Sequence, residues 1–216
     1  MLGTRGPPAR GRRAPSRSGA LMDDTATDRL EPHDIAFLRG GPRAAVTVAV
    51  LALHLRGAVE AGRAGTLRTT RAPSGAGRAL PALPKAVHSA LYRPAGIRQL
   101  LDRRGVRAAL AGLRRDLVAA GLLRGFPPGR TAAGRRTLRS LRDRHPLPAS
   151  GKGLPDGELL LAAALYGDRA LTSLVPRFTR EAGLVGRGGT TERDQRQSWG
   201  GGGEGGAGAG LSCAGV

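Results

Sequence analysis

Few residues of this 216-residue chain could perform chemistry. The sequence contains one cysteine, Cys213, and four histidines: His33, His54, His88 and His145. Zinc sites use three or four converging ligands, and no two of these histidines have the four-residue spacing that shares one helical face. We therefore predict no metal site and interpret His54 as a partly buried helix residue. Cys213 lies among Gly, Ser and Ala, whereas reactive cysteines lie in electropositive surroundings, so we interpret it as an unreactive thiol.

A nucleotide-binding loop and a catalytic carboxylate pair are also not indicated. The stretch Gly151-Lys152-Gly153 lacks a Ser or Thr after the lysine, and Pro146 occupies the position of the first glycine of such a loop. Between residues 35 and 101 the only acid is Glu60, which we expect at the surface of a hairpin. General acid–base catalysis needs positioned proton donors and acceptors. We predict that the protein is not an enzyme and uses no cofactor or small-molecule ligand.

Arginine dominates the charge of the chain. There are 35 Lys and Arg residues against 16 Asp and Glu, a formal net charge of +19, and only Lys85 and Lys152 are lysines. GC-rich codons favour Arg, Ala, Gly and Pro, so composition bias explains part of this charge. The alternative is a polyanionic partner, either nucleic acid or an anionic membrane surface. The charge is concentrated, because residues 98–144 hold 13 arginines and three aspartates.

A predicted helix at residues 106–120 carries the candidate contact surface. Its apolar stripe follows i, i+4, i+7, i+11 spacing: Val106, Leu110, Leu113 and Leu117. The candidate contact residues lie off this stripe, before the helix or at the hairpin after it: Arg103, Arg104, Arg107, Arg114, Arg115, Arg124 and Arg130. Arginine binds phosphates, guanine edges and carboxylates. We expect an unidentified protein partner, with DNA as the alternative, because Asp116 and the lack of Asn, Gln, Lys and Ser in this helix weigh against DNA.

The elements that position these residues are mainly helices with short β-hairpins. A short helix capped by Asp34 is broken at Gly40-Gly41-Pro42, and a helix buried on most sides follows at residues 43–56. Gly57 ends that helix, and residues 59–61 and 66–70 form a hairpin. A second set follows, with helices at residues 85–92, 96–103 and 106–120, Gly121 as the helix end, and a hairpin at residues 122–131.

The two sets share one order of elements. Shifted by 64 residues, Leu53 aligns with Leu117 and Gly57 with Gly121. Helices followed by a helix, a glycine, a strand, a turn and a strand are typical of a winged helix. We predict tandem winged-helix-like units, the first of them incomplete because only two helices precede its hairpin.

Helices without a hairpin are predicted for the rest of the ordered chain. The first covers residues 131–144, with Leu138 and Leu141 inward. The next begins with Asp156 as its cap and is interrupted at Gly167-Asp168 before a last helix that carries Phe178. We expect four aromatic residues in the core: Phe37, Tyr92, Tyr166 and Phe178.

The prediction divides the chain into six segments. These are a disordered basic arm (1–30), the first unit (31–72), a linker (73–84), the second unit (85–131), C-terminal helices (132–185) and a disordered Gly-rich tail (186–216) with Trp199. Met22 offers an alternative start of translation. No apolar signal region follows the first arginines, and no apolar run approaches the roughly 18 residues of a membrane span. We expect a cytoplasmic protein, or one held at the membrane periphery by a partner.

Five stretches resemble an uncharacterised actinobacterial family of membrane or membrane-associated proteins with a Gly- and Cys-rich C-terminal tail. They are residues 37–45 (FLRGGPRAA), 65–68 (GTLR), 91–101 (LYRPAGIRQLL), 144–148 (RHPLP) and 165–171 (LYGDRAL). The resemblance covers about residues 31–185 and implies no activity and no site residues to carry over. Because the sequence also lacks a catalytic constellation, we predict a non-catalytic binding or scaffold module of such a family, with a winged-helix DNA-binding regulator as the alternative. This chain departs from the family pattern in lacking an evident membrane span and in having one cysteine in its tail.

Overall fold

The computed structural model describes residues 30–63, 65–70 and 80–185. The predicted arm up to residue 29, most of the linker and the Gly-rich tail, with Trp199 and Cys213, lie outside these residues. Residues 31–185 of the described part belong to one compact unit. As the sequence predicts, this unit is mainly helical with two antiparallel strand pairs.

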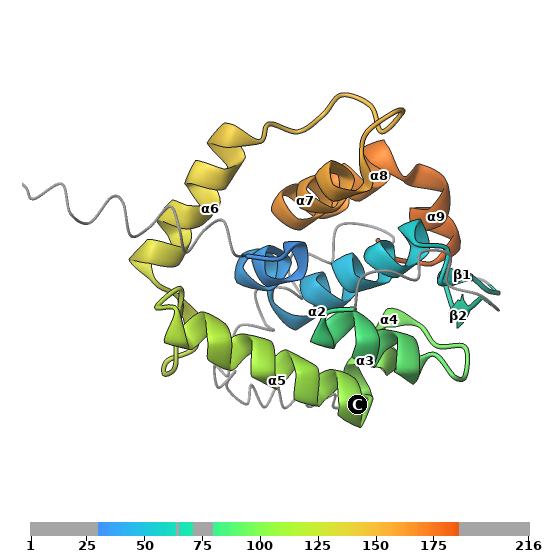
Figure 1. The fold of residues 1–216 in the computed structure, drawn as a ribbon, viewed down its shortest axis with the longest axis horizontal. Coiled ribbons are helices and arrows are strands. Elements are labelled where there is room, and N and C mark those ends of the chain that lie inside the picture. Colours follow the sequence, from blue (N-terminus) through green and yellow to red (C-terminus); the bar gives the residue numbers. More distant parts are fainter. Residues whose placement is uncertain (1–29, 64, 71–79, 186–216) are drawn as a thin grey trace, which may run out of the picture. The chain divides into compact units, whose positions relative to one another are not determined.

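The elements follow one another in the predicted order (Figure 1). The first set comprises α2 (Pro32–Leu55), β1 (Val59–Ala61) and β2 (Leu67–Thr69). The second set comprises α3 (Ala82–Ala90), α4 (Ile97–Asp102), α5 (Arg104–Ala119), β3 (Leu123–Arg124) and β4 (Gly129–Arg130). The C-terminal helices are α6 (Ala132–Arg144), α7 (Asp156–Tyr166), α8 (Asp168–Leu174) and α9 (Pro176–Glu181).

Helix α2 is the centre of the core. It contacts α3, α4, α5, α6 and α7, and Figure 1 shows α7 and α8 on one side of it and α3 and α5 on the other. Nearly every residue from Ile35 to Leu51 is buried, which confirms the prediction of a helix buried on most sides. The predicted segments are therefore held together by one shared helix.

The predicted break in α2 is a kink. Gly40 has φ −140° and ψ 15°, and Gly41 has φ 72° and ψ −162°, so the helical hydrogen-bond pattern is interrupted before Pro42. The N-cap, however, is Glu31 and not Asp34. Asp34 lies in the first turn, where its Oδ2 accepts a hydrogen bond of 3.0 Å from the Glu31 N–H. Such a contact satisfies a backbone donor that the helix itself leaves unpaired.

The two predicted hairpins begin from the same helix ending. At the end of α2, the Gly57 N–H bonds to the His54 carbonyl and the Ala58 N–H to the Leu53 carbonyl, both at 2.8 Å. At the end of α5, the equivalent pairs of Gly121 with Val118 and Leu122 with Leu117 measure 2.9 and 3.0 Å. Both are Schellman endings with glycine at positive φ.

In each hairpin, a threonine after the second strand bonds to the glycine that ends the preceding helix. The Thr70 hydroxyl donates to the Gly57 carbonyl, and the Thr131 hydroxyl donates to the Gly121 carbonyl at 2.7 Å. Among the described residues, no third strand pairs with the second hairpin. The segment between α3 and α4 pairs instead with the first hairpin, through the Leu67–Ala95 bridge. The two sets therefore share one order of elements and also contact each other through this bridge.

Four further details differ from the sequence prediction. Helix α3 begins at Ala82, three residues early, because Pro84 falls in the first turn, where its missing N–H costs nothing. Pro155 is the N-cap of α7 and Asp156 is its first residue. The last predicted helix is two helices, α8 and α9, separated at Val175.

The fourth detail is Tyr92, which is 67% exposed and was wrongly predicted in the core. The helix ends at Ala90, so Leu91 occupies the buried position and Tyr92 points outward. Phe37 and Phe178 are buried as predicted, and Tyr166 is half-buried with its hydroxyl bonded to the His145 carbonyl at 2.9 Å.

Helix α2 also corrects the expectation about apolar segments. Within the described residues it is long enough and apolar enough to cross a membrane, by length and composition. In this structure 78% of its most apolar window is buried inside the protein. A core helix and a membrane span both satisfy such a test, so length and composition alone do not distinguish the two.

Asp34 should make stability depend on pH. Burial raises the pKa of its carboxyl, as do the charges of Glu31 and Asp116, against the opposing effects of His33 and the Glu31 N–H. The folded state therefore holds this proton to higher pH than the unfolded state, and the associated stability is lost as pH rises through the raised pKa.

Asp34→Asn keeps an oxygen acceptor and removes the charge. We expect its urea midpoint to fall less steeply than that of the wild type between about pH 4 and 7; parallel curves would contradict this assignment.

Candidate functional site

The arginines of α5 lie on one side of the helix. Val106, Leu110, Leu113 and Leu117 are 0–7% exposed and face the core. At about 100° per residue, Arg104, Arg107, Arg114 and Arg115 fall within an arc of about 100° beside this stripe. Asp116 lies roughly 100° beyond Arg115, outside the arc. We call Arg104, Arg107 and Arg115, all exposed, together with Arg103 and Arg114 at its edge, the α5 basic face; Arg124 is also exposed but lies on β3.

Arg103 marks the N-terminal end of this face. It is the N-cap residue of α5, and its Nη1 donates a hydrogen bond of 3.2 Å to the Tyr92 hydroxyl. Its guanidinium also lies 5.3 Å from the centre of the Tyr92 ring, and that of Arg93 lies 5.7 Å from it. Cation–π contacts of this kind orient an arginine without neutralising it. Tyr92 therefore belongs to the surface that the sequence assigned to arginines alone.

Arg114 connects α5 to the second hairpin. Its Nη2 donates a hydrogen bond of 3.0 Å to the Gly125 carbonyl, at the first residue of the turn between β3 and β4. The antiparallel register pairs Leu123 with Arg130 and Arg124 with Gly129. Arg114 thus fixes the hairpin against the helix, a structural contact that the sequence prediction of a contact residue did not include.

Phe126 occupies the turn of this hairpin and is 93% exposed. Pro127 and Pro128 follow it and are exposed as well. Phe126 is not among the contact residues predicted from the sequence. A signal was present, because an aromatic residue between Gly125 and two prolines lies in a turn, where no core can cover it.

Arg130 does not lie with the α5 basic face. Its backbone carbonyl accepts a hydrogen bond of 3.1 Å from Arg135 Nη1, at the start of α6. Burial lowers the pKa of the Arg130 guanidinium, and the charges of Arg142 and Arg135 lower it further. The structure therefore places five of the seven predicted contact arginines on or next to α5, the sixth, Arg124, at an exposed position on β3, and the seventh beside α6.

The α5 basic face is not neutralised by acids in the described part of the chain. The side-chain ion pairs there include Arg68 with Glu60 at 2.9 Å and Arg177 with Glu181 at 3.0 Å. Among the residues that the structure describes, no arginine of the α5 basic face forms an ion pair with an acidic side chain. The positive potential of the face therefore remains available to a partner. Glu60 lies on the first hairpin at the surface, as predicted.

His54 and His33 contact neighbouring residues of the fold. The His54 ring stacks on Phe178, with ring centroids 3.6 Å apart and an interplanar angle of 1°. Its Nδ1 lies 3.1 Å from the Val59 carbonyl, which joins the end of α2 to β1. His33 Nε2 is 3.8 Å from Asp34 Oδ1. Among the residues that the structure describes, no three His, Cys, Asp or Glu side chains form a group that could hold a metal ion.

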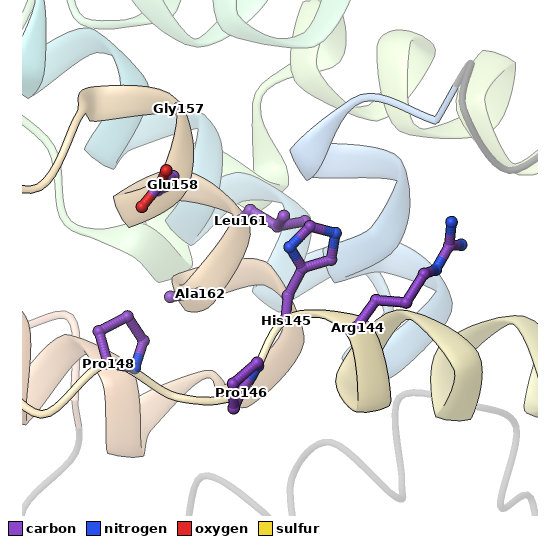
Figure 2. Close-up of a pocket in the computed structure, with 8 residues that line it drawn as sticks. All are labelled: Arg144, His145, Pro146, Pro148, Gly157, Glu158, Leu161 and Ala162. Carbon is purple, nitrogen blue, oxygen red and sulfur yellow. The ribbon is translucent and has the colours of Figure 1, made fainter.

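A pocket of about 310 Å³ lies between the end of α6 and the start of α7 (Figure 2). Its lining residues are Arg144, His145, Pro146, Pro148, Gly157, Glu158, Leu161 and Ala162. Figure 2 shows the His145 ring beside Leu161 and the Glu158 carboxylate apart from it, on the first turn of α7. These two titratable groups do not converge on one point, as a general acid and base acting on one substrate would.

Comparison of the chain with models of protein families, with curated proteins and with solved structures finds no match.

Proposed function

We propose that the protein is a non-catalytic binding module, and that the α5 basic face together with the tip of the second hairpin contacts a partner protein. The partner surface would be acidic, with an apolar recess that receives Phe126. We also propose that the chain belongs to the actinobacterial membrane-associated family that its sequence resembles, as a binding or scaffold member. Its location would be cytoplasmic or peripheral to a membrane.

The exposure of Phe126 is the observation that carries this proposal. A phenylalanine that is 93% exposed leaves most of its apolar surface in water. Arg114 of the α5 basic face bonds to the Gly125 carbonyl, so the turn that carries Phe126 is attached to this face. Aromatic residues and arginines are the side chains most enriched in the energetic centres of protein interfaces. Phosphates alone would need the arginines but not the phenylalanine.

DNA binding is the second candidate, because the order of helices and strands in the second set supports it. Three helices and a hairpin, α3 to β4, follow the winged-helix order, with the arginine-rich third helix exposed on its outer side. In this interpretation α5 enters the major groove and Arg124 contacts a phosphate from the wing. Arg107 and Arg115 would be the principal contacts of the helix.

Two variants separate the candidates. The double variant Arg107→Gln, Arg115→Gln removes two exposed charges from the face without touching the Arg114–Gly125 contact. Phe126→Ala removes the ring alone. The double variant Arg169→Gln, Arg180→Gln, at exposed positions on α8 and α9, is the charge-matched control. All proteins are full-length and are first compared by circular dichroism and thermal unfolding.

The probes are peptides selected from a random displayed library on the wild-type protein, and a mixed-sequence 20-base-pair DNA duplex near physiological salt. We expect acidic peptides with an apolar residue, whose affinity falls about tenfold with Phe126→Ala and with the α5 double variant, but not with the control. Peptides that bind all four proteins equally would overturn the proposal. Duplex binding lost only with the α5 double variant would replace it by DNA recognition.

A further inference from the structure

Another pocket, of about 280 Å³, lies between α2, the start of α3 and α7. Its walls are mainly apolar and include Val48, Ala49 and Ala52 of α2, Pro84 of α3 and Leu160 of α7. We call this space the α2–α7 pocket. Small-molecule sites often lie between the helices of a bundle, and their volumes begin at about 300 Å³. The α2–α7 pocket is close to this lower limit, so it suits a small ligand.

The kink of α2 brings distant parts of that helix to the same pocket. His33, in the first turn of α2, and Val48, in its second half, both line the pocket. A straight helix would separate these two residues by roughly 22 Å, because each residue rises about 1.5 Å. The non-helical backbone at Gly40 and Gly41 therefore folds the two parts of α2 toward each other. Ala52 also lines the space between them and is too small to fill it.

One arginine lines this apolar space. Arg56 is the C-cap residue of α2, and its N–H donates a hydrogen bond of 3.4 Å to the Ala52 carbonyl, which fixes its backbone beside the pocket. The residue is half-buried. Among the residues that the structure describes, its guanidinium forms no ion pair with an acidic side chain. A cation that has lost part of its water without gaining a partner is stabilised when an anion binds it.

Glu31 and His33 are the other ionisable side chains that line the pocket. His33 Nε2 lies 3.8 Å from Asp34 Oδ1, and the His33 side chain is 12% exposed, so its near neighbour is an acid of its own helix turn. Glu31 is exposed, so water solvates its carboxylate. The pocket therefore offers a ligand apolar walls and one half-buried cation, Arg56.

We propose that the α2–α7 pocket binds a small apolar carboxylic acid, with the hydrocarbon part between the helices and the carboxylate on Arg56. A guanidinium group forms paired, charge-assisted hydrogen bonds with a carboxylate, and the apolar walls remove the hydrocarbon from water. The site uses none of the α5 basic face, so it goes beyond the proposed partner contact. The sequence prediction of no small-molecule ligand did not consider this pocket, because its walls come from three separate parts of the chain.

The test measures binding of octanoate and of 3-phenylpropanoate to the full-length chain by titration calorimetry at constant ionic strength. Arg56→Gln should weaken binding about tenfold. Arg98→Gln removes the same charge from an exposed position on α4 and should change binding less than twofold. Ala52→Leu places a larger side chain in the pocket and should weaken binding at least tenfold. Thermal unfolding checks that each variant folds, and Arg56→Gln decides the test if Ala52→Leu does not fold.

Two further probes separate the contributions of charge and hydrocarbon. Acetate lacks the apolar part and octylamine carries the opposite charge, so both should bind at least tenfold more weakly than octanoate. Failure to bind either acid, or equal losses in Arg56→Gln and Arg98→Gln, would overturn the proposal. Octylamine binding that is tighter than octanoate binding would overturn it too, since Glu31 would then select the ligand. Phe126→Ala should bind octanoate as the wild type does, which keeps this result independent of the partner contact.

Discussion

Gly134→Ala should destabilise the protein by about 2–3 kcal/mol, because the first turn of α6 has no room for a side chain at this position. A Cβ on Gly134 would overlap the Leu122 carbonyl oxygen and would lie 3.1 Å from Leu38 Cδ1. The carbonyl cannot move freely, since it accepts a hydrogen bond of 3.1 Å from the Thr131 N–H. The Gly134 N–H in turn donates to the Thr131 Oγ1 at 3.0 Å.

The urea midpoint of Gly134→Ala measures this cost. An unchanged m-value would show that the variant still unfolds in two states. Gly112→Ala is the matched control. Gly112 lies inside α5, and the nearest atom to its added Cβ is Arg115 Nη2 at 3.8 Å. Alanine there should stabilise the protein by about 0.5–1 kcal/mol through helix propensity. Equal midpoints for the two variants would show that α6 does not approach Leu122 as closely as described.

Gly41→Asn should cost about 2–3 kcal/mol, while Gly57→Asn should cost less than about 1 kcal/mol. Both glycines have positive φ, 72° and 68°. Gly41 combines this φ with ψ −162°, a region that only glycine occupies at low energy, and it is buried in the kink of α2. Gly57 is the C′ residue of a Schellman ending and is exposed, a position that asparagine tolerates.

Thermal unfolding of the two asparagine variants compares the same substitution at the two kinds of site. A loss at Gly57 as large as that at Gly41 would mean that the kink is not the strained position. Because α2 contacts five other helices, a change in its kink would alter the packing of those helices as well. The Gly40-Gly41-Pro42 stretch lies within the apolar helix α2, and its backbone geometry divides this helix into two parts.

The sequence predicted the helices and hairpins well because their signals are local. The i, i+4 stripe of Val106, Leu110 and Leu113 specifies which side of α5 is buried, and all three are buried. A glycine after the last apolar residue specifies where a helix ends, as Gly57 and Gly121 show. Periodicity and end residues depend only on neighbours within a few positions in the chain.

The candidate contact surface was predicted in part for the same reason. Spacing along α5 places Arg107 and Arg115 off the apolar stripe, and both are exposed. Spacing does not say what each long side chain reaches. Arg114 extends to a carbonyl eleven residues away, and Arg142 to a carbonyl at the end of another helix. Arginine side chains reach past several neighbours, so their partners follow from the packing of elements.

The sequence alone therefore determined the order of the elements, their buried sides and the concentration of arginine between residues 98 and 144. Only the tertiary structure decided that Arg130 joins α6, that Tyr92 lies outside and that Gly134 faces the Leu122 carbonyl. These features depend on distances between groups that are separate in the chain. Such distances are set when helices pack together, and no local pattern encodes them.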